Sequence, residues 1–296
     1  MIVVKLMGGL GNQMFQYAFG KNLAIKNNTS LKVDLSFLLD RTPIEGFVFR
    51  DFDLDIFTLK ADTVAENEVE EFKRSKPFFS RLLSGGNSNT TIINEKVFHF
   101  DPSAIVMKKN CYASGYWQSE KYFQEIEAII RKEFTFKTAL NEFESELNSE
   151  ILNTNSVCIN FRRTDFVHVK NSADTHGATE LSYYENAIQL ITSKVENVHF
   201  FIFSDDIEWC KLNVKTNFPT TFVGHEYKGE KFSSYFQLMI NCKHFIIPNS
   251  TFAWWAAWLS QNENKIVIAP KRWFLDVNLQ NASMDIFPSS WIQLES

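Results

Sequence analysis

Two adjacent arginines mark the segment with the clearest potential for chemistry, which reads INFRRTD from Ile159 to Asp165. The apolar residues before them predict a strand ending at Phe161, so Arg162 and Arg163 follow its carboxyl end. Side chains alternate along a strand, so one arginine can face a ligand while the other braces the loop. Guanidinium groups match the oxygens of a diphosphate in pairs. Asp165 could orient an arginine, and the alternative is a surface ion pair.

A pair of aspartates, Asp205 and Asp206, follows the apolar strand expected over His199–Phe203. A carboxylate at a strand end can accept paired hydrogen bonds from guanine N1 and N2, or from ribose hydroxyls. Adjacent aspartates at a helix start are also ordinary capping residues, which the residue types alone favour. No further ligand cluster accompanies them, so the sequence predicts no metal site.

Small polar residues also precede an aromatic helix expected over Phe252–Ser260. Asn249, Ser250 and Thr251 stand where a strand ends and this helix begins. Amides and hydroxyls at a helix N-terminus can bind phosphate. The tryptophans that follow could equally be core packing.

Glycines 8, 9 and 11 separate a strand expected over Ile2–Met7 from a helix expected over Asn12–Asn27. A glycine turn before a helix lets a ligand approach the backbone, and Asn12 could cap the helix. The turn lacks the third glycine of the dinucleotide fingerprint and the Lys-Ser/Thr of a Walker loop. A plain tight turn is the alternative.

These segments fall into two runs of alternating strands and helices, which predict an α/β fold with parallel sheets. The polar stretch from Asn153 to Ser156 interrupts the pattern. We therefore expect an N-terminal domain over residues 1–153 and a C-terminal domain over residues 154–296. Two such domains facing across a cleft would bind ligands outside the carboxyl ends of their strands.

Composition narrows the function and the compartment. The formal net charge of −5, from 30 basic and 35 acidic residues, argues against a dedicated nucleic-acid binder. The four cysteines lack metal-ligand spacing and predict free thiols in a reducing compartment. The N-terminus lacks signal-peptide features, and no stretch reaches the roughly 18 apolar residues of a membrane span, which predicts a cytoplasmic protein. Basic and aromatic residues alternate over Lys73–Leu83, which predicts a solvated loop or a contact with the inner membrane surface.

Six segments together resemble the bacterial α-1,2-fucosyltransferases. The segments occur in that family's order and cover nearly the whole chain. They are GGLGNQMFQYA (8–18), GYWQSEKYF (115–123), FRRTDF (161–166), THG (175–177) with the Tyr183–Tyr184 pair after it, FIFSDDIEWC (201–210) and NSTFAWWAAWL (249–259).

The resemblance implies a GT-B fold of two Rossmann-like domains. It also implies inverting transfer of fucose from GDP-β-L-fucose without a metal or other cofactor. The expected acceptor is the 2-hydroxyl of a terminal galactose in a surface polysaccharide or O-antigen. The donor-binding residues implied are Gly9, Gly11 and Asn12 from the N-terminal domain, and Asn160, Arg162, Arg163, Asp205, Asp206, Asn249, Ser250 and Thr251 from the C-terminal domain. The resemblance also implies their roles. Arg162 and Arg163 would bind the diphosphate, Asp205 or Asp206 would bind the guanine, and Ser250 and Thr251 would bind phosphate.

The chain departs from the family at two places. Asn160 stands where relatives usually have histidine, and RRTDF stands where they tend to read RRGDY. An acceptor hydroxyl must lose its proton during transfer. We expect His176 to be the base, with Asp165, Asp174 and Glu180 as rivals and a structural loop histidine as the alternative.

Three other functions stay open at this point. One is a transferase of the same fold with another donor or linkage. Another is a non-catalytic relative that binds GDP-sugar or glycan, which Asn160 makes conceivable. The third is an NAD-dependent oxidoreductase, against which the missing third glycine and the paired arginines count.

Overall fold

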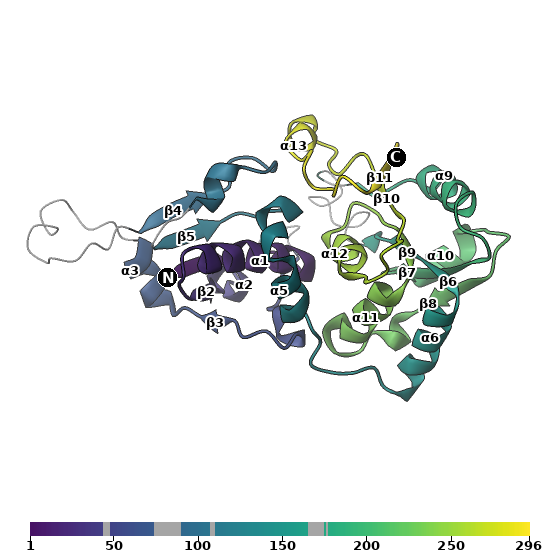
Figure 1. Cartoon of the computed structure of the whole chain (residues 1–296), viewed down its shortest axis with the longest axis horizontal. Helices are drawn as coiled ribbons and strands as arrows, with labels where there is room; N and C mark the ends of the chain where they lie inside the picture. Colours follow the sequence, from purple (N-terminus) through teal and green to yellow (C-terminus); the bar gives the residue numbers. More distant parts are fainter. Residues whose placement is uncertain (44–47, 74–89, 107–109, 165–174, 176) are drawn as a thin grey trace, which may run out of the picture. The chain divides into compact units, whose positions relative to one another are not determined.

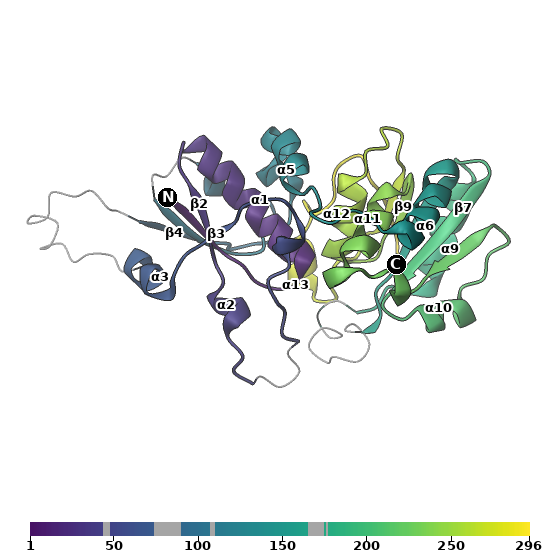
Figure 2. The same cartoon turned by 90° about the horizontal axis from the view of Figure 1, so that it is seen from below.

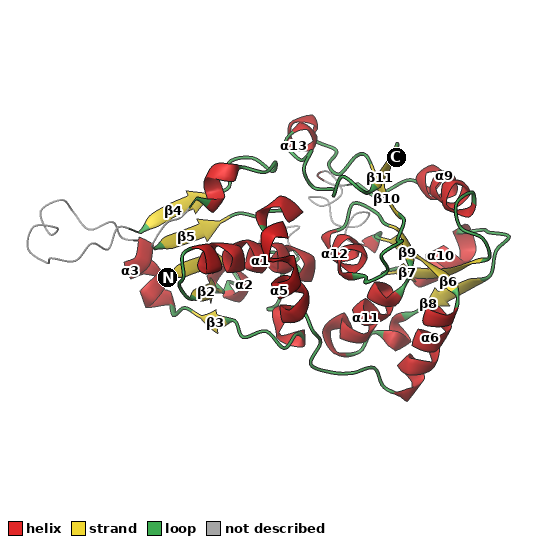
Figure 3. Ribbon diagram, in the orientation of Figure 1, coloured by secondary structure: helices red, strands yellow, loops and turns green. Residues whose placement is uncertain are grey.

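A computed structural model describes residues 1–43, 48–73, 90–106, 110–164, 175 and 177–296 (Figure 1). These residues form two compact units. The first unit contains Met1–Pro43, Val48–Thr135 and Ser283–Ile286, and the second contains Phe136–Ala282 and Phe287–Ser296. Each unit is built on one sheet of parallel strands, shown in yellow in Figure 3.

The first unit has a five-stranded sheet in the order β3-β2-β1-β5-β4. Its strands are β1 (Ile2–Lys5), β2 (Leu31–Asp34), β3 (Asp62–Thr63), β4 (Thr91–Asn94) and β5 (Cys111–Ser114). Its helices are α1 (Leu10–Lys26), α2 (Ser36–Leu39), α3 (Glu66–Lys73) and α5 (Glu127–Glu133). Every strand pair in it is parallel.

The helix α1 begins earlier than its sequence pattern predicts. Its N-cap is Gly9, which makes no side-chain capping bond, so the expectation that Asn12 caps the helix is wrong. The Asn12 side chain instead accepts a hydrogen bond from Gln118 Nε2 at 3.0 Å. Gly8, at φ +74°, makes the turn that lets the helix start directly after β1.

Two buried glutamines of α1 hold this turn in place. Gln13 Nε2 donates to the carbonyls of Gly8 at 2.9 Å and Asp51 at 2.8 Å, and its Oε1 accepts from the Asp53 N–H at 2.9 Å. Gln16 Oε1 accepts from the Met7 N–H at 2.9 Å. These bonds satisfy backbone groups that no strand or helix pairs.

The second unit has a six-stranded sheet in the order β11-β10-β9-β6-β7-β8. Its strands are β6 (Asn155–Phe161), β7 (Val198–Ser204), β8 (Thr220–Val223), β9 (His244–Ile246), β10 (Val267–Pro270) and β11 (Ile292–Leu294). Its helices are α6 (Glu142–Asn153), α9 (Leu181–Thr192), α10 (Ile207–Asn213), α11 (Ser233–Asn241), α12 (Thr251–Leu259) and α13 (Val277–Asn281).

Numbered from its own first strand, this sheet has the order 3-2-1-4-5-6 of the doubly wound dinucleotide-binding fold. The two halves meet where β6 pairs with β9, and ligands bind such sheets outside the strand ends at that switch point. The predicted α/β class with Rossmann-like parallel sheets is therefore confirmed.

Helices cover both faces of the second sheet (Figure 2). Val157, Ile159 and Phe161 of β6 pack in one core with α9 and α10. Cys158, between them, faces the opposite way and contacts Cys242 after α11. Because both faces are covered, the strands are apolar on both sides, which explains their continuous apolar runs.

Several elements differ from the sequence-based expectation. The helix expected over Gln118–Glu133 is formed only in its last part, because Phe123 at φ −142° separates two short 3-10 turns that precede α5. The helix α6 ends at Asn153, where the domain boundary was expected, and it packs with α11 in the second unit. No helix among the described residues is long and apolar enough to cross a membrane. Residues 74–83 of the expected membrane contact lie outside the described residues.

Candidate active site

The candidate donor site gathers at the carboxyl ends of β6, β7 and β9, on both sides of the switch point. Arg162 and Arg163 directly follow β6, and Asp205 and Asp206 directly follow β7. The segment from Asn249 to Thr251 connects β9 to α12. The strand order thus brings together three motifs that are far apart in the sequence.

The register of β6 and β7 pairs the arginines with the aspartates one to one. Phe161 lies opposite Ser204 in the parallel ladder, so the next residues face each other in the same order. Arg162 Nη1 lies 2.9 Å from Asp205 Oδ2, and Arg163 Nε lies 3.8 Å from Asp206 Oδ2. Both arginines therefore form partly buried ion pairs at the strand ends, and their contact with a diphosphate stays a prediction.

Asp205 holds the loop that follows β6. Its carboxylate accepts the backbone N–H of Arg163 at 2.8 Å and that of Thr164 at 3.2 Å. It also accepts the Thr164 hydroxyl at 2.6 Å. With the Arg162 ion pair, these bonds use about as many lone pairs as two carboxylate oxygens carry.

Asp206 caps α10, as the residue types predicted. Its Oδ1 accepts the N–H of Trp209 at 3.2 Å. The Arg163 guanidinium stacks on the Trp209 ring, with Cζ 3.5 Å from the ring centroid. Arg163 is therefore placed by two groups of the same helix start.

Three buried tyrosines fix the ends of the strands. Tyr184 donates to the Asn160 carbonyl at 3.1 Å, and Tyr183 donates to the Ile247 carbonyl at 2.7 Å. The Tyr235 hydroxyl accepts the Ser204 N–H at 2.6 Å. Burial raises the pKa of all three hydroxyls, so they stay neutral and act as hydrogen-bonding supports.

Asn160 and Asn249 are also buried, and both amide side chains bond within the fold. Asn160 Nδ2 donates to the Phe203 carbonyl at 3.2 Å, which links the ends of β6 and β7. Asn249 Nδ2 donates to the carbonyls of Gly177 at 3.3 Å and Trp273 at 3.1 Å. These contacts give both residues a role in positioning the loops around the switch point.

Ser250 is the N-cap of α12, and Thr251 is its first residue. Ser250 makes no side-chain capping bond, and the first turn of α12 contains no acidic residue. Trp254 and Trp255 of this helix are fully buried, so the core-packing interpretation holds for them. The N-terminus of α12 therefore lies beside the switch point, and no Ser250 side-chain bond or acidic residue of its own first turn competes there with an anion.

Comparison with known proteins gives the family. The model of glycosyl transferase family 11 matches residues 91–295. The chain belongs to this family. The fucosyltransferase resemblance indicated by the six motifs is thereby confirmed, and the protein is a glycosyltransferase.

Relatives of this family 11 glycosyltransferase occur in bacteria and mammals. The α-1,2-colitosyltransferase of Escherichia coli is 33% identical over 99% of this chain and 99% of its own length. The O-antigen biosynthesis glycosyltransferase WbnK of Escherichia coli is 30% identical over 98% and 99%. Galactoside α-(1,2)-fucosyltransferase 2 of Mus musculus is 25% identical over 87% and 67%. The solved structure of fucosyltransferase NodZ from Bradyrhizobium is 13% identical, with a TM-score of 0.48, over 86% of this chain and 91% of that one.

The structure does not bring the other predicted residues of the family 11 glycosyltransferase into this group. Gly9, Gly11 and Asn12 belong to the first unit, and their contact with a donor stays a prediction. His176, Asp165 and Asp174 lie outside the described residues. Glu180 is the exposed N-cap residue of α9 and makes no side-chain capping bond.

Sequence reasoning missed two residues that organise the arginines. In the sequence, Thr164 stands out only as a departure from the RRGDY pattern, and Trp209 only as part of the FIFSDDIEWC segment. The signal for both was their position: Thr164 directly follows the arginine pair, and Trp209 lies three residues after Asp206 on the first turn of α10. Cys210, next to Trp209, is buried, and burial raises the pKa of its thiol to about 11, which makes it an inert core residue.

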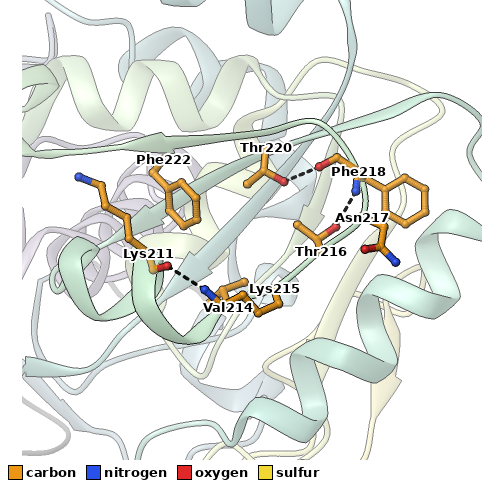
Figure 4. Close-up of a pocket in the computed structure, with 8 residues that line it drawn as sticks. All are labelled: Lys211, Val214, Lys215, Thr216, Asn217, Phe218, Thr220 and Phe222. Carbon is orange, nitrogen blue, oxygen red and sulfur yellow. Dashed lines mark hydrogen bonds between the residues drawn. The ribbon is translucent and has the colours of Figure 1, made fainter.

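A hollow of about 670 Å³ lies away from these residues, at the amino end of β8 (Figure 4). Three of its polar side chains bond within α10 and the loop that leads from α10 to β8. Thr216 accepts the Phe218 N–H at 3.1 Å, Thr220 donates to the Phe218 carbonyl at 2.9 Å, and Lys215 Nζ donates to the Lys211 carbonyl at 3.4 Å. The hollow therefore has no part in the candidate site.

Within the part of the chain that the structure describes, no three histidine, cysteine, aspartate or glutamate residues gather as metal ligands. Among the described residues, those at the ends of β6 and β7 include two arginines and two aspartates, Arg162, Arg163, Asp205 and Asp206. Positive charge there comes from guanidinium groups and from the N-terminus of α12.

Proposed function

We propose that this family 11 glycosyltransferase transfers fucose from GDP-β-L-fucose to the 2-hydroxyl of a terminal galactose. The observation that carries the proposal is the placement of an arginine pair after β6 and a helix N-terminus after β9, on the two sides of one switch point. That arrangement suits a nucleoside diphosphate, whose negative oxygens can be shared between guanidinium forks and backbone amides.

The mechanism we propose is an inverting displacement. The acceptor hydroxyl attacks C1 of fucose from the face opposite the leaving group, the C1–O bond to the β-phosphate breaks, and GDP departs. Charge grows on the β-phosphate as that bond breaks. Arg162, Arg163 and the N-terminus of α12 would stabilise this charge without a metal, because they are fixed before the reaction begins. His176 is the proposed base for the acceptor proton, with Asp165, Asp174 and Glu180 as rivals.

Asp206 is the better candidate for reading guanine. Asp205 is occupied by Arg162, Arg163 and Thr164, whereas the ion pair of Asp206 Oδ2 with Arg163 Nε, at 3.8 Å, is long. A carboxylate with a free lone pair can accept the N1–H and N2–H groups of guanine. We therefore assign the base contact to Asp206 and the loop contact to Asp205.

A second candidate donor is GDP-colitose. Colitose is fucose without its 3-hydroxyl, so one site could take either sugar. The 33% identity to an α-1,2-colitosyltransferase over nearly the full chain favours this candidate. Both candidates would form an α-1,2 linkage, and the similarity to WbnK supports an acceptor in O-antigen synthesis.

The test measures GDP release from GDP-fucose and from GDP-colitose, each with and without lactose, in EDTA. Arg162→Ala should abolish release, and Arg131→Ala, an arginine on α5 of the first unit, is the matched control and should not. Mass spectrometry and glycosidic linkage analysis of the product would give the sugar and the linkage.

Each outcome has a separate meaning. Lactose-dependent release from GDP-fucose that survives EDTA supports the proposal, and faster release from GDP-colitose would replace the donor. Dependence on added Mg²⁺ would contradict the metal-independent mechanism. GDP binding without any turnover would support the non-catalytic alternative, and failure to bind GDP would reject the proposal.

A further inference from the structure

The two arginines of the candidate site are held in different ways. Arg162 forms a close ion pair with Asp205 at 2.9 Å. Arg163 has no such bond: its Nε is buried and lacks a hydrogen-bond partner among the described residues, and Asp206 lies 3.8 Å away. Hydrogen bonds in the described structure therefore do not fix the Arg163 guanidinium.

The Trp209 ring supplies the missing support. The Arg163 Cζ lies 3.5 Å from the ring centroid, which is a close stacking distance. A cation over an indole face is attracted by the negative face of the ring, and a planar guanidinium stacks flat on it. Stacking leaves the edge of the guanidinium, where all N–H groups lie, free of the ring.

Trp209 itself is firmly placed. Its backbone N–H donates to Asp206 Oδ1 at 3.2 Å, and its backbone carbonyl accepts a hydrogen bond from Asn213 Nδ2 at 2.8 Å. Its ring packs beside Phe161, the last residue of β6, with a centroid distance of 6.2 Å. The ring is thus anchored to α10 and to the strand that carries the arginines.

We infer that Trp209 is a positioning residue that presents the Arg163 guanidinium to the diphosphate of the nucleotide donor. The inference rests on the proposed function and adds a residue to it. Without the indole face, Arg163 would sample several rotamers and would lose entropy on binding phosphate. The indole face therefore raises diphosphate affinity without touching the ligand.

The test compares Trp209→Leu, Trp209→Phe and Trp209→Tyr by calorimetric binding of GDP and by steady-state kinetics with GDP-fucose. Loss of a cation–π contact predicts a roughly fivefold to thirtyfold rise in the GDP Kd of the leucine variant, with a parallel rise in KM. The phenylalanine and tyrosine variants keep an aromatic face and should recover most of the affinity. Phe218→Leu, an exposed ring on the α10–β8 loop, is the matched control and should bind GDP like the wild type.

A double-mutant cycle separates this role from a general loss of structure. In an Arg163→Ala background, Trp209→Leu should cause no further rise in Kd, because the group that it positions is gone. An equal loss in both backgrounds, or unchanged GDP binding by Trp209→Leu, would overturn the inference. Wild-type protein that fails to bind GDP would instead reject the proposed function.

Discussion

Arg162 and Asp205 form an ion pair of 2.9 Å across the ends of two neighbouring parallel strands, one step beyond the last ladder pair, Phe161 and Ser204. The strand register itself aligns the pair, so neither side chain depends on a long loop for its position. The same aspartate accepts two backbone N–H groups of the loop after β6. Asp205 therefore couples the position of the arginines to the core of the second unit.

Asp205→Asn should lower kcat/KM by about 10- to 100-fold, because an amide loses the ion pair and part of the loop bonds. Since Asp205 holds the loop and does not read the base in our assignment, the preference for GDP over ADP should stay unchanged. Competition binding of the two nucleotides to wild type, Asp205→Asn and Asp206→Asn measures this. Loss of guanine preference in the Asp205 variant alone would show that the two roles are reversed.

Thr164→Val should weaken the loop after β6 by removing its hydroxyl bond to Asp205, which is 2.6 Å long. One such bond to a charged group contributes about 1.5–3 kcal/mol, so turnover should fall about 10- to 100-fold. Thr164→Ser keeps the hydroxyl and is the matched control. Equal activity of the valine and serine variants would show that the hydroxyl is unimportant.

The second unit could be predicted well from the sequence, and the first unit less so. The strands β6, β7, β9 and β10 are buried on both faces and therefore appear as continuous apolar runs. The short strands β3 and β4 were missed because their two and four residues are mostly exposed and show no readable period, and β5 was missed because its four residues, CYAS, are too short and too weakly apolar a run. Their pairing with β1 and β2 is decided by the sheet as a whole.

The residue types alone were enough to predict that the arginines and aspartates belong to the site. Predicting which arginine pairs with which aspartate required the register of β6 and β7. No spacing rule connects Arg163 with Trp209, which is 46 positions later in the sequence and stacks on it only after β6 and β7 pair. Capping by Asp206 was predictable, since it depends on neighbours three residues apart. Features set by residues close together in the sequence, such as helix capping, could therefore be predicted, and contacts between the ends of different strands could not.

Glu95 should make the folded state less stable as pH rises above the ordinary glutamate range. Its carboxylate accepts the N–H groups of Tyr116 at 2.7 Å and Trp117 at 2.9 Å, yet burial raises its pKa above 4.5. Between the ordinary pKa of glutamate in the unfolded chain and the raised pKa of Glu95 in the folded protein, the folded protein binds more protons than the unfolded chain. The free energy of unfolding therefore falls as pH rises through that window.

The measurement is urea unfolding of wild type and Glu95→Gln between about pH 4 and pH 7. Glutamine cannot ionise and keeps an acceptor for one of the two N–H groups. The stability difference between the two proteins should therefore shift in favour of the variant with rising pH. A difference that is constant over this range would contradict the assigned pKa direction.

Gly8 and Gly9 offer a matched pair that separates folding from binding. An added Cβ at Gly8 would lie 2.4 Å from Asn12 Nδ2, and the residue has φ +74°, so Gly8→Ala should cost about 1–3 kcal/mol of stability. At Gly9 the nearest atom to an added Cβ is Arg50 Cδ at 4.0 Å, and φ is −79°, so Gly9→Ala is free of strain and loses only the preference of an N-cap for glycine over alanine, about 0.5–1 kcal/mol. Thermal unfolding of both variants checks these values. If Gly9 approaches the donor as the family resemblance implies, Gly9→Ala should lower transferase activity even at temperatures well below its melting temperature. Unchanged activity of Gly9→Ala would restrict the glycine turn to a structural role.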